Sequence, residues 1–149
     1  MVTIHAMTPE DDAEWRALWN GYLAFYEARL DAETSAAAFD RLLDPASPVH
    51  GAFARDERGD AVGLVHWLTH PATWTRTDYC YLEDLFVAPA ARRAGVGAAL
   101  IAHVVTWARQ HGSAKVYWLT EETNETARAL YDRVATRSGF IQYQVKLTD

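Results

Sequence analysis

A short loop between a predicted strand and a predicted helix constrains the fold more than any other segment of the chain. The loop, residues 92–97, has the sequence Arg-Arg-Ala-Gly-Val-Gly. An apolar run from Tyr79 to Val87 precedes it, and apolar residues at helical spacing follow it over residues 97–110. The free N–H groups and the dipole at the start of a helix favour anions, and glycines let a phosphate approach the backbone. The segment therefore predicts a strand, a phosphate-binding loop and a helix.

Three other interpretations of this loop are conceivable, and the sequence argues against two of them. A dinucleotide-binding fingerprint needs a third small residue at position 100, where the chain has Leu100. A nucleotide-binding P-loop needs Gly-Lys followed by Ser or Thr, which this loop does not contain. A plain tight turn, in which the glycines serve backbone geometry alone, remains possible from the loop by itself.

The remaining sequence has the pattern of a single mixed α/β domain over residues 1–149, without a linker, repeat or low-complexity segment. The expected order is a strand near residues 2–4, helices beginning after Thr8 and Thr34, strands 50–55, 61–68 and 79–87, helix 97–110, strand 116–119, helix 124–138 and strand 140–147. Hairpins fill the first half, and strand–helix–strand units fill the second. We therefore expect an α+β mixed sheet of about six strands flanked by helices.

Composition excludes several classes of protein. A net charge of −6 and an isoelectric point near 5.4 argue against a nucleic-acid partner. No apolar run is long enough to cross a membrane, and residues 1–5 do not resemble a secretion signal. Cys80 is the single cysteine, so we expect no disulfide and a cytoplasmic location. No group of His, Cys and Asp residues has metal-ligand spacing, and we expect no metal site.

The pattern Arg92-x-x-Gly95-x-Gly97 resembles the acetyl-CoA pyrophosphate loop of the GNAT superfamily of N-acetyltransferases. Residues 81–87 are similar to the strand that precedes the loop in this family. The pattern Asn124-x-x-Ala127-x-x-Leu130-Tyr131 is similar to a later helix, and Gly139-Phe140 to the start of the last strand. The resemblance covers essentially the whole chain and implies the GNAT-type acyl-CoA N-acyltransferase fold.

The resemblance implies acetyl-CoA as co-substrate and gives roles to individual residues. The backbone of Leu85 and Val87 would bind the pantetheine amides, and the loop amides would bind the pyrophosphate. Asn124 would contact the pantetheine, and Tyr131 would lie near the thioester sulfur. The full expected set for acetyl-CoA is Leu85, Phe86, Val87, Arg92, Arg93, Ala94, Gly95, Val96, Gly97, Ala98, Asn124 and Tyr131.

Direct transfer of acetyl to a primary amine needs two proton transfers. An alkylammonium, with a pKa of about 10.4, must lose a proton before it attacks, and the leaving thiolate is helped by gaining one. Tyr131 is the candidate acid, and Glu83, a carboxylate within an apolar strand, is the candidate base. Asp84 competes with Glu83, because a β-bulge can change which of the two faces the site. His66 and His70 could line the site or relay a proton, but we expect neither to be essential.

The acceptor is expected to be a small amine, polyamine-like or amino-acid-like, bound by Tyr22, Tyr26, Glu83 and His66. A protein or peptide acetyltransferase and a non-catalytic acyl-CoA-binding module are the alternatives. Eight positions separate Tyr131 from Gly139, a longer helix that resembles the diamine- and histone-type branch. The resemblance also implies a homodimer.

Overall fold

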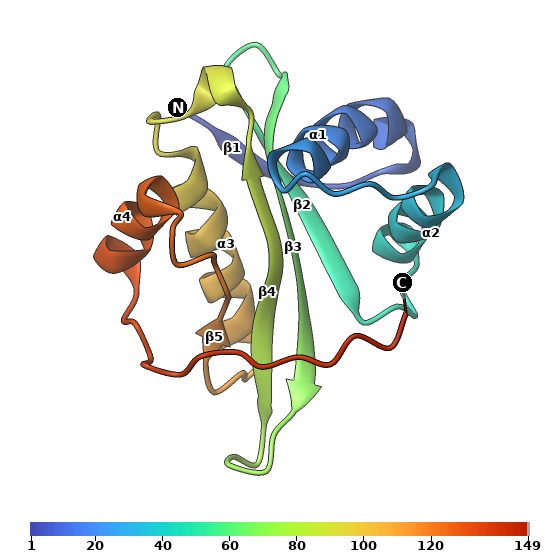
Figure 1. Ribbon diagram of the computed structural model, residues 1–149. Helices are drawn as coiled ribbons and strands as arrows, with labels where there is room; N and C mark the ends of the chain where they lie inside the picture. The colour runs from blue at the N-terminus through green and yellow to red at the C-terminus, as the bar shows by residue number, and fades with distance from the viewer. Residues whose placement is uncertain (149) are drawn as a thin grey trace. The chain divides into compact units, whose positions relative to one another are not determined.

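The computed structural model describes residues 1–148, which form two compact units. The N-terminal unit comprises residues 1–119, and the described part of the C-terminal unit comprises residues 120–148. The N-terminal unit contains β1 (Thr3–Ala6), η1 (Pro9–Asp11), α1 (Asp12–Phe25), α2 (Ala32–Leu43), β2 (Val49–Arg55), β3 (Ala61–Pro71), β4 (Asp78–Val87), η2 (Pro89–Ala91), α3 (Val96–Gln110) and β5 (Val116–Tyr117) (Figure 1). The C-terminal unit contains α4 (Glu125–Val134).

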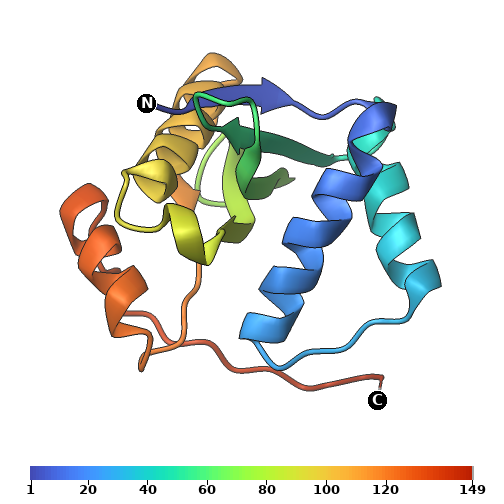
Figure 2. The same cartoon turned by 90° about the horizontal axis from the view of Figure 1, so that it is seen from above.

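The N-terminal unit is built on one mixed sheet with the order β1-β2-β3-β4-β5. The first four strands pair antiparallel, and β5 pairs parallel with β4. Helices α1 and α2 cover one face of the sheet, and α3 covers the other (Figure 2). The prediction of a mixed α/β fold with a central sheet flanked by helices is confirmed.

The sheet has five strands rather than about six. The strand expected over residues 140–147 is not formed, and within the described chain residues 135–148 contain neither helix nor strand. Alternation of apolar residues predicts an extended backbone, but a strand also requires a hydrogen-bonded neighbour. Helix α4 is shorter than expected, ending at Val134, where residues 135–138 bring in the weak helix formers Thr136 and Ser138.

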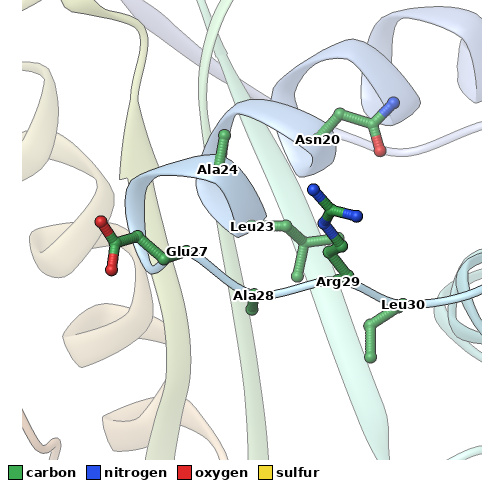
Figure 3. Close-up of a pocket in the computed structure, with 7 residues that line it drawn as sticks. All are labelled: Asn20, Leu23, Ala24, Glu27, Ala28, Arg29 and Leu30. Carbon is green, nitrogen blue, oxygen red and sulfur yellow. The ribbon is translucent and has the colours of Figure 1, made fainter.

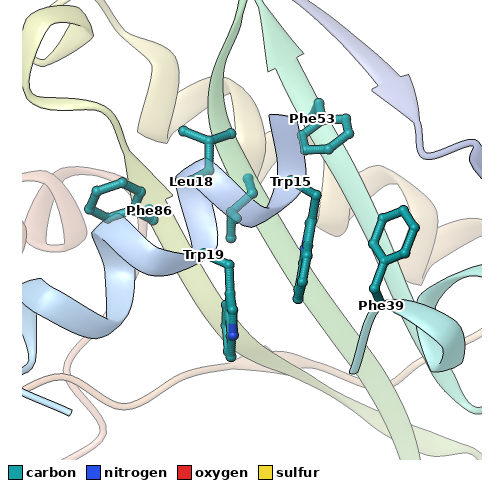
Figure 4. Packing of buried hydrophobic residues seen from close by; sticks show 7 residues of the cluster. Trp15, Leu18, Trp19, Phe39, Phe53 and Phe86 are labelled. Atoms are coloured by element: carbon teal, nitrogen blue, oxygen red, sulfur yellow. The ribbon is translucent and has the colours of Figure 1, made fainter. Parts of the chain in front are cut away.

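The apolar face predicted for α1 forms the centre of the core between that helix, α2 and the sheet. Figure 4 shows six of its side chains as labelled sticks. The buried cluster consists of Trp15, Leu18, Trp19, Phe39, Phe53, Leu64 and Phe86. The rings of Trp15 and Trp19 stack with their centroids 5.4 Å apart. This cluster fixes α1 against β3 and β4, the two strands that carry the predicted site residues.

On the opposite face, α3 packs closely on the sheet. Its buried residues are Val96, Leu100, Ile101, Val104 and Ala108. A Cβ atom at Gly63 of β3 would lie 3.0 Å from the Val96 side chain and 3.1 Å from the Phe86 carbonyl oxygen. This close approach holds the first turn of α3, and therefore the loop before it, against the end of β4.

Candidate active site

Strands β4 and β5 pair over only two residues and leave one edge of β4 open. The paired residues are Cys80 with Val116 and Tyr81 with Tyr117, where β5 ends. On its other side, β4 stays paired with β3 as far as Val87, and the Ala88 amide donates to the Val62 carbonyl at 2.8 Å. Because hydrogen bonding alternates along an antiparallel pair, Leu85 and Val87 direct their backbone groups away from β3, toward the open edge. This edge can accept an extended ligand as an additional strand.

The loop from η2 to α3 places free backbone amides beside this edge. Arg93 and Gly95 both have positive φ, 67° and 78°, and Gly95 is the residue before the first turn of α3. The Ala99 amide donates to the Gly95 carbonyl at 3.0 Å, so the amides of Val96, Gly97 and Ala98 come before the first bond of this kind. The free amides and the helix dipole give this loop the donors that an anion site needs, and its role in binding the pyrophosphate stays a prediction.

The two loop arginines have different environments. Arg92 donates from Nε to the Val87 carbonyl at 3.1 Å, and its guanidinium lies 5.6 Å from the Phe25 ring centroid and 5.8 Å from that of Phe86. It therefore connects the loop to the end of β4 and to the end of α1. Arg93 is exposed. Phe86, predicted among the cofactor residues, has its ring in the core cluster.

A β-bulge in β4 brings the two candidate carboxylates together. His66 of β3 is opposite Asp84, but the next residue of β3, Trp67, is opposite Leu82, which leaves Glu83 as the extra residue. Glu83 therefore lies between Asp84, the partner of His66, and Leu82, the partner of Trp67. The charge of Asp84 raises the pKa of Glu83, and a charge on His66 would lower it, so all three side chains lie close together. The sequence did not decide whether β4 contains a bulge. The structure shows one, and it brings the Glu83 and Asp84 carboxylates close to each other and to His66.

Asp84 belongs to a buried chain of hydrogen bonds that starts on α1. The indole Nε1 of Trp15 donates to Nε2 of His66 at 3.0 Å, and Nδ1 of His66 is 2.9 Å from Oδ2 of Asp84. Trp15 is fully buried, and His66 is 3% exposed. The Tyr22 hydroxyl also hydrogen-bonds to Asp84. Burial, first, and the charge of Asp84 raise the pKa of Tyr22 well above its ordinary value, so Tyr22 remains a neutral donor.

Glu83 has the environment of a general base. Its side chain lies at the surface of the bulge, yet partial loss of hydration, first, and the charge of Asp84, second, raise its pKa. Burial and the Glu83 charge raise the pKa of Tyr81 to about 12, and the same two causes raise that of Tyr117. A carboxylate with a raised pKa, next to groups that stay neutral, can take a proton from an ammonium group at moderate pH.

Tyr22 and Tyr26, predicted to bind the acceptor, adjoin this region on α1. Their ring centroids are 5.0 Å apart, and Tyr22 also stacks on Trp19 at 5.4 Å. A separate open pocket of about 660 Å³ lies at the end of α1 (Figure 3). It is lined by Asn20, Leu23, Ala24, Glu27, Ala28, Arg29 and Leu30. None of the predicted acceptor residues lines that pocket, and helical spacing places Tyr22 on a different face of α1.

Asn124 and Tyr131 belong to the C-terminal unit. Asn124 caps α4, with its side-chain oxygen accepting a bond from the Ala127 amide at 3.3 Å. Its NH₂ group is the part left to donate elsewhere. Tyr131 follows two turns later on the same helix, and its carbonyl accepts from the Ala135 amide. The roles of these two residues toward acetyl-CoA stay predictions.

The sequence missed Trp15 as a polar residue of the site. The helical spacing identified it as core, which is correct, but did not indicate where its N–H group points. His70, by contrast, contacts the Tyr117 hydroxyl at 2.7 Å and the Pro71 carbonyl at 2.9 Å. Among the described residues no group of three His, Cys, Asp or Glu side chains could hold a metal ion. No described helix has the length and apolar character needed to span a membrane.

Comparison with known proteins places this architecture among acetyltransferases. The sequence model of the acetyltransferase (GNAT) family matches residues 15–135. The chain is 35% identical over 144 residues to the D-amino-acid N-acetyltransferase HPA3 of Saccharomyces cerevisiae, covering 96% of this chain and 89% of the yeast protein. It is 27% identical over 144 residues to the uncharacterized N-acetyltransferase YhfO of Bacillus subtilis, with 95% of each chain covered.

Solved structures share the fold at lower identity. The ribosomal-protein-alanine N-acetyltransferase from Brucella melitensis biovar Abortus has a TM-score of 0.83 and 22% identity, covering 99% of this chain and all of that chain. The enzyme AAC(6')-Iy, solved with a CoA bisubstrate analog, has a TM-score of 0.84 and 19% identity, with 99% of both chains covered.

Proposed function

The chain belongs to the acetyltransferase (GNAT) family of acetyl-CoA-dependent N-acetyltransferases, and we propose that its acceptor is the primary amine of a small molecule. The observation that carries the proposal is the pair of carboxylates at the β4 bulge, beside Tyr22 of α1. Aromatic rings and anionic side chains together favour a cationic amine. An amino-acid-like or polyamine-like compound fits this chemistry.

Two features of the donor site suit acetyl-CoA: an open strand edge and free loop amides. The open edge of β4 offers the backbone groups of Leu85 and the N–H group of Val87, which an amide-containing pantetheine arm can pair with. The loop amides offer donors for the pyrophosphate at the start of α3. Acetyl-CoA supplies the activated acetyl group, and the rest of the chemistry falls to side chains of this chain.

Glu83 acts as the base in this proposal. The ammonium group of the acceptor loses one proton to the Glu83 carboxylate, which leaves a neutral amine with a free electron pair. The amine nitrogen then forms a bond to the acetyl carbon as the bond to sulfur breaks. Tyr131 donates a proton to the departing sulfur, as the family resemblance implies, and the second proton of the newly bonded nitrogen then passes to the Tyr131 oxygen and restores its hydroxyl. The products are an N-acetylated amine and CoA.

Two relatives support a small acceptor. The names of the yeast relative and of AAC(6')-Iy describe enzymes for D-amino acids and for aminoglycosides. The Brucella neighbour is named for a protein substrate, so the peptide alternative needs a direct test. A cytoplasmic location is part of the proposal and is supported by the buried, unpaired Cys80.

The test is a screen for free thiol released from acetyl-CoA. The acceptors are D- and L-amino acids, diamines, polyamines, aminoglycosides and lysine-containing peptides, each confirmed by the mass of the acetylated product. We expect turnover with one group of small amines and little with peptides. Turnover with peptides alone would establish the protein-acetyltransferase alternative. Binding of CoA without turnover of any acceptor would identify a non-catalytic module.

We also propose that the chain forms a homodimer through its C-terminal segment. Five large apolar side chains there, Phe140, Ile141, Tyr143, Val145 and Leu147, are between 73% and 92% exposed. Their side chains need a cover, because apolar groups of this size are unfavourable in water. Light scattering of Ile141→Asp should show a monomer, and Gln142→Asp should keep the dimer. A wild-type monomer at micromolar concentration would refute the proposal.

A further inference from the structure

Strands β3 and β4 carry two features that acetyl transfer in general does not require. The bulge brings two carboxylates, Glu83 and Asp84, against one histidine. That histidine, His66, is almost fully buried and is bonded on both ring nitrogens. A buried polar chain of this kind is expensive to form, so each member must be satisfied by the next.

The hydrogen bonds fix the protonation of the His66 ring. The indole N–H of Trp15 can only donate, so Nε2 of His66 must accept. The single proton of the neutral ring is therefore on Nδ1, which donates to Oδ2 of Asp84 at 2.9 Å. A second proton on Nε2 would place two N–H donors, that of His66 and that of Trp15, against each other at a buried position. Trp15 thus holds His66 in one neutral tautomer.

The same bonds fix the position of the Asp84 carboxylate. His66 donates from β3 and Tyr22 from α1, so two donors from two elements converge on one side chain. A carboxylate anion accepts both bonds without carrying a proton of its own. The aromatic rings of Trp15 and Trp19, with centroids 6.0 Å and 5.5 Å from that of His66, keep the ring in place.

The charge on this fixed carboxylate acts on Glu83. The titratable groups that face Glu83 are Asp84 and Tyr81 on β4, His66 on β3, Tyr22 on α1 and Tyr117 on β5. The charge of Asp84 raises the pKa of Glu83, and a positive charge on His66 would lower it. Because Trp15 keeps His66 neutral, the charge of Asp84 is not cancelled.

We propose that His66 is a positioning residue for acetyl transfer: held neutral by Trp15, it fixes the Asp84 carboxylate beside Glu83 and so sets the pH range in which Glu83 accepts the proton of the acceptor amine. The inference rests on the proposed function, in which Glu83 is the base. His66 itself contacts neither substrate in this scheme. A histidine that only filled the core would affect stability and leave the pH dependence of catalysis unchanged.

The experiment is a set of pH profiles of kcat/KM, recorded from pH 5 to pH 10 with an acceptor found in the screen. Asp84→Asn removes the neighbouring charge, so the acid limb should move to lower pH by roughly one unit. His66→Leu removes the donor to Asp84, so the carboxylate pair takes up a proton more readily. Its acid limb should move in the opposite direction, to higher pH.

His66→Asn is the rescue variant. The amide nitrogen of Asn can replace Nδ1 as donor to Asp84, so this variant should bring the acid limb back toward the wild-type position. Identical acid limbs in wild type, Asp84→Asn and both His66 variants would overturn the proposal. Where His66→Leu fails to fold, Asp84→Asn decides the charge effect, because an acid limb that does not move to lower pH in this variant overturns the proposal, and NMR tests the His66 tautomer separately.

Two measurements separate the inference from the proposed function. Loss of the acid limb of the kcat/KM profile in Glu83→Gln supports Glu83 as base. An unchanged acid limb in this variant refutes that role independently of the results for the His66 variants. Nitrogen NMR of ¹⁵N-histidine-labelled protein reports the tautomer without any substrate. We expect the ring proton of His66 on Nδ1 and none on Nε2. A ring that carries its proton on Nε2 would overturn the inference.

Discussion

His66 and Trp67 are neighbours in β3, yet they lie on opposite faces of the sheet and in contrasting surroundings. On the α1 face, His66 is bonded at both nitrogens, and the buried indole of Trp15 has its N–H group satisfied. On the α3 face, Trp67 is equally buried, but its Nε1 has no hydrogen-bond partner among the described residues. It packs instead against aromatic rings, with centroids 5.6 Å from those of His103 and Trp107. The α1 face is organised for polar chemistry, and the α3 face for packing.

The largest effect should come from the carboxylate at the bulge. Glu83→Gln keeps the size of the side chain and removes the base, so kcat/KM should fall by roughly 10²- to 10⁴-fold at neutral pH. The measurement is steady-state thiol release, with Glu10→Gln, an exposed position on η1, as the control. Equal activity in the two variants would contradict the role of the α1 face in catalysis.

Matched replacement of the two buried indoles compares the faces directly. Trp15→Phe leaves Nε2 of His66 without its donor, whereas Trp67→Phe removes an N–H group that is already unpaired. Both variants lose the same ring volume, so the difference between them isolates the hydrogen bond. Trp15→Phe should be the less stable by about 1–3 kcal/mol in urea unfolding. Equal free energies of unfolding would mean that the Trp15 bond contributes little.

On the α3 face, only the first turn of α3 and the loop before it should contribute to activity, by binding the donor. Alanine substitutions of two glycines test this expectation. Gly95 in the loop and Gly59 in the β2–β3 turn both have positive φ, and a Cβ at either position would meet no atom within 4 Å. Alanine at each should therefore cost a similar ~1 kcal/mol of backbone strain. Gly95→Ala alone should raise the KM for acetyl-CoA, by about three- to tenfold. A similar KM in both variants would show that the loop does not bind the donor.

The smallest effect concerns stability and pH. Burial and Asp84 raise the pKa of Glu83 in the folded protein, so folding favours its protonated form. That stabilisation is full below the ordinary pKa of a glutamate and is lost as the pH rises through the raised value. Glu83→Gln, which is neutral at every pH, should therefore be more stable than wild type at pH 8 by a few tenths of a kcal/mol, a small figure because the side chain is exposed.

Thermal melts from pH 4 to pH 8 measure this difference. The two proteins should melt alike near pH 4 and separate as the pH increases. A variant less stable than wild type at pH 8 would mean that the Glu83 carboxylate is better solvated than its surroundings indicate.

Local patterns in the sequence predicted much of this molecule. The helical spacing of Trp15 and Trp19 identified the buried face of α1, and the glycine-containing loop identified the start of α3. These features depend on residues within one or two turns of each other. The choice between Glu83 and Asp84 did not follow, because a bulge depends on pairing across a hairpin, and β3 and β4 are joined by residues 72–77. Residues 140–147 show the same limit, since alternation does not provide a pairing partner.

The bulge divides β4 into two stretches that can change independently. In our proposal Glu83, the extra residue of the bulge, and the residues before it face the acceptor, and Leu85 and Val87 after it present the edge for the donor. The extra residue takes up the change of register between them. Substitutions before the bulge can therefore alter the choice of amine while the donor edge keeps its geometry. The same strand can therefore change the amine that the enzyme accepts and keep the edge that binds the acetyl donor.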